Sequence, residues 1–307
     1  MSLDSDKCRK KFKKNDDIRD AGLTTPEDII RYDNIKYGND DKWQLLDVYR
    51  PKDMDGYLPV IVSVHGGGWV YGDKERYQYY CMSLAQHGFA VINYTYRLAP
   101  EFKFPAPIED THKVFNWIIN NAQEYKLDIA NLFAVGDSAG AHILTMFVES
   151  VLNEECKAIL QNYGMQVFTQ VYTKFFYAKQ PNTPIGKCLM LKGIGLNCGI
   201  YKIDESEKLI KDYMPLGGNE EELKILDVTR YVTDDFPAVY MMTCPGDFLF
   251  EQPFYMSEKL TEKDVKFRFT VYGNKENKLT HVFHCDIKSE YAKKCNEDEC
   301  KFFKSLI

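Results

Sequence analysis

The sequence predicts the α/β class, with a mostly parallel eight-stranded sheet and helices on both of its faces. Two observations predict this class. Short apolar, β-rich runs alternate with longer segments of helical periodicity along most of the chain. The central runs are continuously apolar, as expected for parallel strands that are buried on both faces. The length of 307 residues fits one large domain or two, so length alone does not decide the domain count.

Eight runs are expected to be strands, and their order along the chain indicates how they connect. The first two have no helical segment between them, so we expect a hairpin at one edge of the sheet. Most of the others are separated by helical segments, which favours parallel pairing through right-handed crossovers. The expected strands are residues 32–37, 43–49, 60–64, 89–94, 132–135, 191–197, 238–243 and 266–272.

Five segments have the periodicity of helices: residues 76–87, 107–124, 138–152, 252–263 and 289–304. Two stretches do not fit the alternation of strands and helices. Residues 1–31 are polar and expected to be partly helical, and residues 153–188 form a connection far longer than the usual 2–6 or so residues. The second stretch is rich in aromatic residues. We interpret the chain as a single domain, 1–307, with both stretches as cap elements; one amphipathic helix is an alternative for the second and is compatible with a cap.

Charge and hydropathy exclude several classes of protein. The 39 Lys and Arg against 45 Asp and Glu give a net charge of −6, which disfavours sequence-independent binding of nucleic acid. Apolar runs fall far short of the roughly 20 residues that a membrane-spanning helix needs. Residues 1–17 contain no apolar segment of the kind found in secretory signals, so the expected location is cytoplasmic.

The nine cysteines are scattered, without a Cys-x-x-Cys pair or a Cys/His spacing that suits zinc. A chain of this length can bury its own core without disulfides. We therefore expect free thiols in a reducing compartment and no metal site.

The strongest motif is Gly136-Asp137-Ser138-Ala139-Gly140, which follows an apolar run and opens an apolar helical segment. This is G-x-S-x-G in a strand–turn–helix setting, where small residues permit a sharp turn that presents the serine hydroxyl above the sheet. The start of the helix adds partial positive charge where an oxyanion would form. We expect Ser138 to be a nucleophile; the alternative is an ordinary strand–helix turn.

A second motif, His65-Gly66-Gly67-Gly68-Trp69, follows another expected strand. Consecutive glycines let backbone N–H groups approach a ligand closely and donate to a tetrahedral oxyanion. A phosphate-binding loop is one alternative, but the lysine and the glycine spacing of such loops are missing. A merely flexible loop is another. His65 is expected to order the loop by hydrogen bonding and not to act as a base.

A nucleophilic serine needs a base, and the base needs a carboxylate that orients it. With these motifs the acid and then the histidine follow the serine along the chain. His142 lies beside the serine on the same expected helix and is expected to pack there. Beyond that helix two histidines remain downstream: His281, which follows an expected strand and is the expected base, and His284 as its rival. Asp247 follows the preceding expected strand and is the expected acid. Glu251, or a solvated role for Asp247, is the alternative.

With these motifs in this order, the chain resembles the hormone-sensitive-lipase-like family of α/β-hydrolase carboxylesterases over about residues 43–285. Further matching blocks lie at residues 96–101, at 104–107 with Asp110, and at the Asp247-x-Leu249 and His281-x-Phe283 motifs. The chain departs from the family pattern at Val282, where the family often has glycine, and in the length of its 153–188 connection.

The resemblance implies an α/β-hydrolase fold with a helical cap. It also implies an oxyanion hole made by the backbone N–H groups of Gly67, Gly68 and Ala139. Trp69 and Asp137, which lie within the two glycine motifs, are expected to contact the substrate.

Together these residues predict hydrolysis of a small-molecule carboxylic ester, with a short-chain acyl or acetyl group, through a covalent acyl-enzyme and without a cofactor. The same triad would serve a peptidase or a deacetylase. A non-catalytic protein that binds a small molecule in a hydrolase pocket is the alternative from a different class. A homodimer through an edge strand or the last helix stays open.

Overall fold

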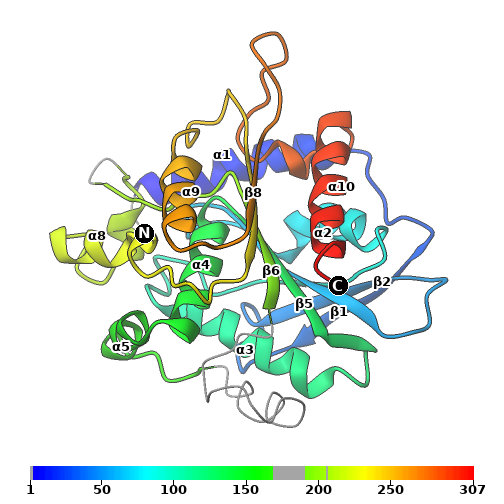
Figure 1. The fold of residues 1–307 in the computed structure, drawn as a ribbon, viewed down its shortest axis with the longest axis horizontal. Helices are drawn as coiled ribbons and strands as arrows, with labels where there is room; N and C mark the ends of the chain where they lie inside the picture. The colour runs from blue at the N-terminus through cyan, green and yellow to red at the C-terminus, as the bar shows by residue number, and fades with distance from the viewer. Residues whose placement is uncertain (1–2, 169–190, 205–206) are drawn as a thin grey trace.

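The computed structural model describes residues 3–168, 191–204 and 207–307 and places eight strands in one sheet (Figure 1). The strand order is β1-β2-β4-β3-β5-β6-β7-β8. β2 pairs antiparallel with β1 and β4, and every other pair is parallel. This confirms the predicted sheet, including its edge hairpin. The strands are β1 (Ile29–Lys36), β2 (Leu45–Pro51), β3 (Leu58–Val64), β4 (Ala90–Tyr94), β5 (Leu127–Asp137), β6 (Leu191–Asn197), β7 (Ala238–Thr243) and β8 (Phe267–Val271).

All five predicted helices are present, together with others that the sequence pattern did not separate. The helices are α1 (Leu3–Asp20), α2 (Lys74–Ala85), α3 (Ala106–Asn121), α4 (Ala139–Leu152), α5 (Glu154–Asn162), α7 (Ile210–Tyr213), α8 (Glu220–Leu226), α9 (Gln252–Glu262) and α10 (Glu290–Lys304). Two short 3₁₀ helices, η1 (Val228–Arg230) and η2 (Phe283–Cys285), lie in connections near the C-terminal strands.

The sheet separates two hydrophobic cores. Successive residues of a strand point to opposite faces, so Val60 and Val62 of β3 enter one core while Ile61 enters the other. The first core is covered by α3, α4 and α9, and the second by α2 and α10. Helix α4 is buried continuously from residue 139 to residue 150, which explains why its sequence is apolar on nearly all sides.

The two stretches that interrupted the predicted pattern lie at different places in the fold. Helix α1 runs across the top of the sheet in Figure 1, whereas α5 lies at the lower left beside α4. The side chain of Arg9 holds α1 in place by donating to Val70 O at 2.7 Å and Ala99 O at 2.8 Å. Phe168 packs against His112 of α3. Residues 169–190 lie outside the described residues, so the cap prediction for that part stays a prediction.

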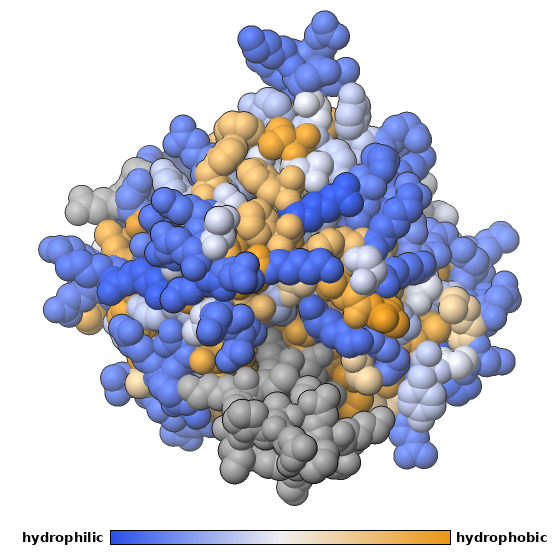
Figure 2. All heavy atoms as spheres, in the orientation of Figure 1, coloured by the Kyte–Doolittle hydropathy of each residue, from blue (hydrophilic) through white to orange (hydrophobic). Residues whose placement is uncertain are grey.

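An apolar patch lies over α9 and the edge strand β8 on the face seen in Figure 2. Its exposed large side chains on these two elements are Phe254, Tyr255 and Val271. The homodimer that the sequence left open stays a prediction. Among the described helices, none combines the length and the hydropathy that crossing a membrane requires.

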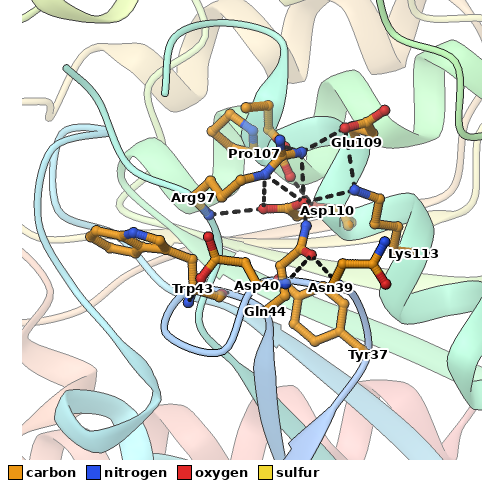
Figure 3. Close-up of polar contacts among 12 residues, drawn as sticks. Tyr37, Asn39, Asp40, Trp43, Gln44, Arg97, Pro107, Glu109, Asp110 and Lys113 are labelled. Carbon is orange, nitrogen blue, oxygen red and sulfur yellow. Dashed lines mark hydrogen bonds and ion pairs between the residues drawn. The ribbon is translucent and has the colours of Figure 1, made fainter. Parts of the chain in front are cut away.

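A buried ion-pair network ties the loop before β2 to the start of α3 (Figure 3). The carboxylate of Asp110 accepts from the backbone N–H of Arg97 at 2.9 Å and from its guanidinium Nε at 3.0 Å. Gln44 donates to the same carboxylate at 2.7 Å. Arg97 also pairs with Glu109 at 2.5 Å. The network therefore orders the block of residues 96–101.

Asp110→Asn should lower the free energy of unfolding by about 2–3 kcal/mol, because it leaves the mostly buried Arg97 guanidinium without its main partner. Urea denaturation measures this change. Glu220→Gln is the control, since Glu220 forms an exposed pair with Lys224 that should contribute nothing measurable. Equal stability of the Asp110→Asn protein and the wild type would show that the network does not stabilise the fold.

Candidate active site

Ser138 stands in a sharp turn between β5 and α4. Its backbone has φ 51° and ψ −121°, a conformation that residues other than glycine rarely adopt. The flanking glycines make room for this turn: a Cβ at Gly136 would lie 2.6 Å from Gly140 O, and one at Gly140 would lie 2.1 Å from Val64 O. The N–H of Ser138 donates to Asn197 O at 3.1 Å, which ties the turn to the end of β6.

Three segments bring a serine, a histidine and an aspartate into one hydrogen-bonded chain. His281 Nε2 lies 2.9 Å from Ser138 Oγ, and His281 Nδ1 lies 2.8 Å from Asp247 Oδ1. Asp247 follows β7, and His281 follows β8 through a loop. An isolated bridge between Gly246 and Thr280 holds these two loops side by side. The three residues that the sequence predicted therefore come together.

The carboxylate of Asp247 is buried but well supplied with donors. Burial alone would raise its pKa, yet the hydrogen bond from His281, the thiol of Cys198 and the N–H of Leu249 outweigh burial and hold the pKa below its usual value. The Leu249 N–H donates to Asp247 Oδ1 at 2.8 Å. Asp247 is thus an anion at neutral pH and can orient the imidazole.

The loop that carries His281 has valine at position 282, where the family pattern often has glycine. Val282 adopts the left-handed conformation with φ 54° and ψ 33°. This conformation is open to glycine and unfavourable for a β-branched residue. Here the surrounding loop imposes the conformation on valine.

The glycine loop after β3 faces the serine. Gly67 and Gly68 have φ of 121° and 61°, and a Cβ at Gly67 would lie 2.1 Å from Tyr71 O. Within the part of the chain that the structure describes, the N–H groups of Gly67 and Gly68 donate to no protein atom. Ala139 is the first residue of α4, so its N–H has no acceptor within its own helix. Among the described residues it has no other acceptor either, so three backbone N–H groups at the serine lack a protein acceptor there.

His65 orders this loop, as predicted. It is fully buried, its Nδ1 lies 2.8 Å from Gly66 O, and its ring stacks on Tyr96 with centroids 4.0 Å apart. The Tyr96 hydroxyl donates to His65 O at 2.8 Å. Burial lowers the pKa of His65 to about 4, so the imidazole is neutral. Tyr96 precedes Arg97, and through it the Arg97–Asp110 network reaches the glycine loop.

Asp137 is buried beside the serine and linked to the glycine loop through a tyrosine of α2. The Tyr77 hydroxyl donates to Asp137 Oδ2 at 2.8 Å and accepts from the Gly66 N–H at 2.9 Å. Burial raises the pKa of Asp137 to about 6, against the hydrogen bond from Tyr77. Tyr77 thereby bridges the two motifs.

Trp69 is also buried, and it packs flat against Tyr213 with ring centroids 5.1 Å apart. Its edge contact is with His142 of α4. Trp69 and Asp137 both line the cavity at the serine. Their predicted contact with a substrate stays a prediction.

A second buried carboxyl lies beneath the serine turn. Glu299 of α10 accepts from Asn197 Nδ2 at 2.9 Å and from the Tyr80 hydroxyl at 3.2 Å. Burial raises the pKa of Glu299 to about 7. The backbone oxygen of Asn197 also accepts the hydrogen bond from the Ser138 N–H. Because Glu299 holds the side chain of the same asparagine, its carboxyl supports the serine turn from below.

A cavity of about 900 Å³ opens at Ser138 and His281. Its walls include the glycine loop and apolar side chains near the acid and the base. Helix α1 forms part of the lining through Cys8 and Phe12, and Leu209 lines it close to Gly68. None of the described residues 153–168 reaches this cavity.

Neither His284, the alternative candidate for the base, nor Glu251, the alternative candidate for the acid, lines the cavity at Ser138. His284 is fully buried against Tyr80, and burial lowers its pKa to about 3. Its Nε2 lies 3.6 Å from Cys285 Sγ, so it is turned toward the core and not toward Ser138. Glu251 precedes α9 with an exposed side chain and does not line the cavity.

The eight cysteines that the structure describes are free thiols; Cys188 lies outside the described residues. In the described ranges, one group of side chains has metal-ligand chemistry at close range: the donor atoms of Cys198, Asp247 and His281 lie within 4.8 Å of one another. Two of the three, Asp247 and His281, are already hydrogen-bonded to each other. Sequence reasoning missed Cys198, because the contact joins the ends of two neighbouring strands and leaves no local pattern.

Other residues at the site were also missed. Glu299 and Leu209 come from segments far from the motifs, whereas Tyr77 lies on the helix that follows the glycine loop; no spacing in the sequence marks any of the three. Phe248 could have been noticed, since it directly follows the expected acid. The polar segment 1–31 was expected to be a cap element, but the particular side chains that reach the cavity could not be chosen from its sequence.

Comparison with known proteins agrees with this geometry. The family model BD-FAE matches residues 46–247, more than half of the chain. The chain is 25% identical to the versiconal hemiacetal acetate esterase of Dothistroma septosporum over 225 residues, which cover 71% of this chain and 65% of that protein. It is 30% identical to the ethyl acetate hydrolase of Pseudomonas putida over 153 residues, 49% of this chain and 48% of that protein. The chain thus spans about half to two thirds of the length of these curated relatives.

The crystal structure of Esterase B from Lactobacillus rhamnosis superposes with a TM-score of 0.83 at 20% identity, covering 99% of this chain and 94% of that one. At this identity the likeness concerns the fold, and it confirms the predicted α/β-hydrolase fold. The curated esterase relatives confirm the resemblance to the hormone-sensitive-lipase-like carboxylesterases.

The free energy of unfolding of Glu299→Gln, taken relative to that of the wild type, should rise by roughly 1–3 kcal/mol between pH 5 and pH 8. The folded-state pKa of about 7 lies above the ordinary value of 4.5, so ionisation of Glu299 opposes folding as the pH rises between these values. Urea denaturation at the two pH values measures the difference.

Glu290→Gln, at an exposed position of the same helix, is the control for the loss of one charge from α10. If Glu299→Gln changed stability equally at pH 5 and pH 8, the raised pKa of Glu299 would be refuted.

Proposed function

Because the chain belongs to the BD-FAE family, within the α/β-hydrolase superfamily, we propose that it is a serine hydrolase that cleaves carboxylic esters. The observation that carries this proposal is the hydrogen-bonded chain from Ser138 Oγ through His281 to Asp247, with links of 2.9 and 2.8 Å. Such a chain activates a serine hydroxyl that is otherwise a weak nucleophile. Acyl transfer also needs hydrogen-bond donors for the oxyanion, and in this proposal the backbone N–H groups of Gly67, Gly68 and Ala139 supply them.

In the proposed first half-reaction, Ser138 Oγ attacks the ester carbonyl carbon while His281 Nε2 takes the hydroxyl proton. The carbonyl oxygen becomes an oxyanion, which accepts hydrogen bonds from the N–H groups of Gly67, Gly68 and Ala139. Asp247 holds the proton-bearing Nδ1 in place and stabilises the imidazolium. His281 then protonates the leaving alcohol, and an acyl-enzyme remains on Ser138.

In the second half-reaction, water replaces the alcohol. His281 takes a proton from the water as it attacks the acyl carbonyl, and the oxyanion forms at the same three donors. When this intermediate collapses, the proton returns to Ser138 Oγ and the carboxylic acid leaves. Every proton thus passes through one imidazole, and no cofactor is required.

We propose acetyl or other short acyl groups as the acid part of the ester. Two observations support this choice. The names of both curated relatives refer to acetate esters. Leu209 lies directly above the glycine loop, where a Cβ at Gly68 would come within 2.6 Å of its Cδ1, so there is little room at this wall.

Ser138→Ala should lower kcat for p-nitrophenyl acetate by about three orders of magnitude or more, because the nucleophile is lost. Stopped assays of the purified protein measure this loss, and a fluorophosphonate probe should label the wild type but not the variant. A variant within tenfold of wild-type activity would show that another residue is the nucleophile. Parallel assays on a p-nitroanilide of the same acyl group separate an esterase from a peptidase.

Tyr77→Phe should lower kcat by about 10- to 100-fold with little change in KM, because Gly66 and Asp137 lose the hydroxyl that links the oxyanion loop to the serine turn. Steady-state kinetics on p-nitrophenyl acetate test this. Tyr94→Phe is the matched control: Tyr94 is equally buried, but its hydroxyl pairs with Thr111 at 2.7 Å, away from the loop. Equal losses in both variants would show that the effect is only structural.

A further inference from the structure

The side chain of Phe248 is unusual for its exposure. It is 74% exposed, the highest value for a large apolar side chain among the described residues. It directly follows Asp247, and its ring lies 4.4 Å from the imidazole of His281, centroid to centroid, at an angle of 50°. The neighbouring Leu249 packs against the core instead. Phe248 therefore presents an open aromatic face next to the proposed base.

The same ring lines the cavity of about 900 Å³ at Ser138. This volume is near the upper end for small-molecule sites and far larger than an acetyl group requires. Other aromatic rings share the lining, including Phe12 of α1 and Tyr71, which contact each other edge to face at 5.7 Å. The cavity thus has room for a group much larger than a short acyl chain, and aromatic rings form part of a wall that also carries charged side chains of α1 such as Lys11 and Arg19.

The chemistry of the site decides which part of an ester would contact Phe248. The leaving oxygen receives its proton from His281 Nε2, so it must lie beside the imidazole. The oxyanion points away from it, toward the N–H groups of Gly67 and Gly68. A substituent on the leaving oxygen therefore extends along the imidazole, and the Phe248 ring is packed on that imidazole. Phe248 belongs to the alcohol side of the site.

We propose that Phe248 determines specificity for the alcohol part of the substrate, and that this part carries an aromatic ring. The inference rests on the proposed ester hydrolysis at Ser138. Aromatic pairs gain from offset or edge-to-face contact beyond the area they bury. A rigid ring also loses less conformational freedom than a flexible alkyl chain when it fills a preformed cavity. The substrates are accordingly short-chain esters of aryl or arylmethyl alcohols.

The test compares benzyl acetate, cyclohexylmethyl acetate and ethyl acetate. All three share the acyl group and are esters of primary alcohols, so differences in kcat/KM report contacts of the alcohol part. The wild type should prefer benzyl over cyclohexylmethyl acetate by about three- to tenfold, the range expected for one aromatic pair. Phe248→Ala should abolish this preference, so that kcat/KM for benzyl and cyclohexylmethyl acetate agree within about twofold. Phe248→Leu keeps apolar bulk without a ring and should also lose the preference.

Phe254→Ala is the matched control, because Phe254 is an exposed phenylalanine on α9 outside the cavity lining. It should keep the wild-type ratio.

The proposal is overturned if the wild type does not prefer the benzyl ester, or if Phe248→Ala keeps the preference. Equal losses on benzyl and ethyl acetate would also overturn it, since the ring would then act only by holding His281. Labelling of Ser138 by a fluorophosphonate separates the two levels: an unlabelled wild type refutes the triad and this inference together, whereas a labelled enzyme without benzyl preference refutes this inference alone.

Discussion

The site depends on the close approach of α4 to the end of β3. At Gly140 the two backbones are so near that a Cβ would lie 2.1 Å from Val64 O. This contact forces the chain into the sharp turn that places Ser138 at φ 51°. Because β3 and β5 are parallel neighbours, with Val64 opposite Gly136, the glycine loop and the serine turn leave the sheet at the same edge. Ser138 and the backbone N–H groups of the glycine loop thus face each other as a consequence of packing.

The polar groups beneath this edge would destabilise the fold if they lacked partners. Asp137 and Glu299 are both buried, and a buried carboxyl without hydrogen bonds costs several kcal/mol. Each carboxyl accepts a hydrogen bond from a tyrosine hydroxyl of α2: Asp137 from Tyr77, and Glu299 from Tyr80. Two tyrosines three residues apart lie on one face of a helix, so α2 satisfies both carboxyls at once. The result is a rigid support that holds the loop before any ligand arrives, which is what electrostatic preorganisation requires.

The fold and much of the site could be predicted because they have local signatures. Buried parallel strands are continuously apolar, and the turn at Ser138 needs glycines at fixed positions. Asp247 and His281 could be predicted because each follows a strand whose carboxyl end meets the same edge. The supporting residues could not. Glu299 lies 102 residues from Asn197, with which it shares a hydrogen bond, and no periodicity connects the two.

The sequence by itself determined the strand order along the chain, the serine turn and the glycine loop, because short-range sterics and hydropathy specify each of them; the order of the motifs also singled out Asp247 and His281 as the proposed acid and base. Only the tertiary structure decided that α1 lines the cavity and that Phe248 lies open beside His281. It also showed that Val282 takes a left-handed conformation, in a place where the family often has glycine. These features arise from the packing of segments that are distant in sequence, so no local pattern records them. The cavity wall is therefore a property of the assembled fold.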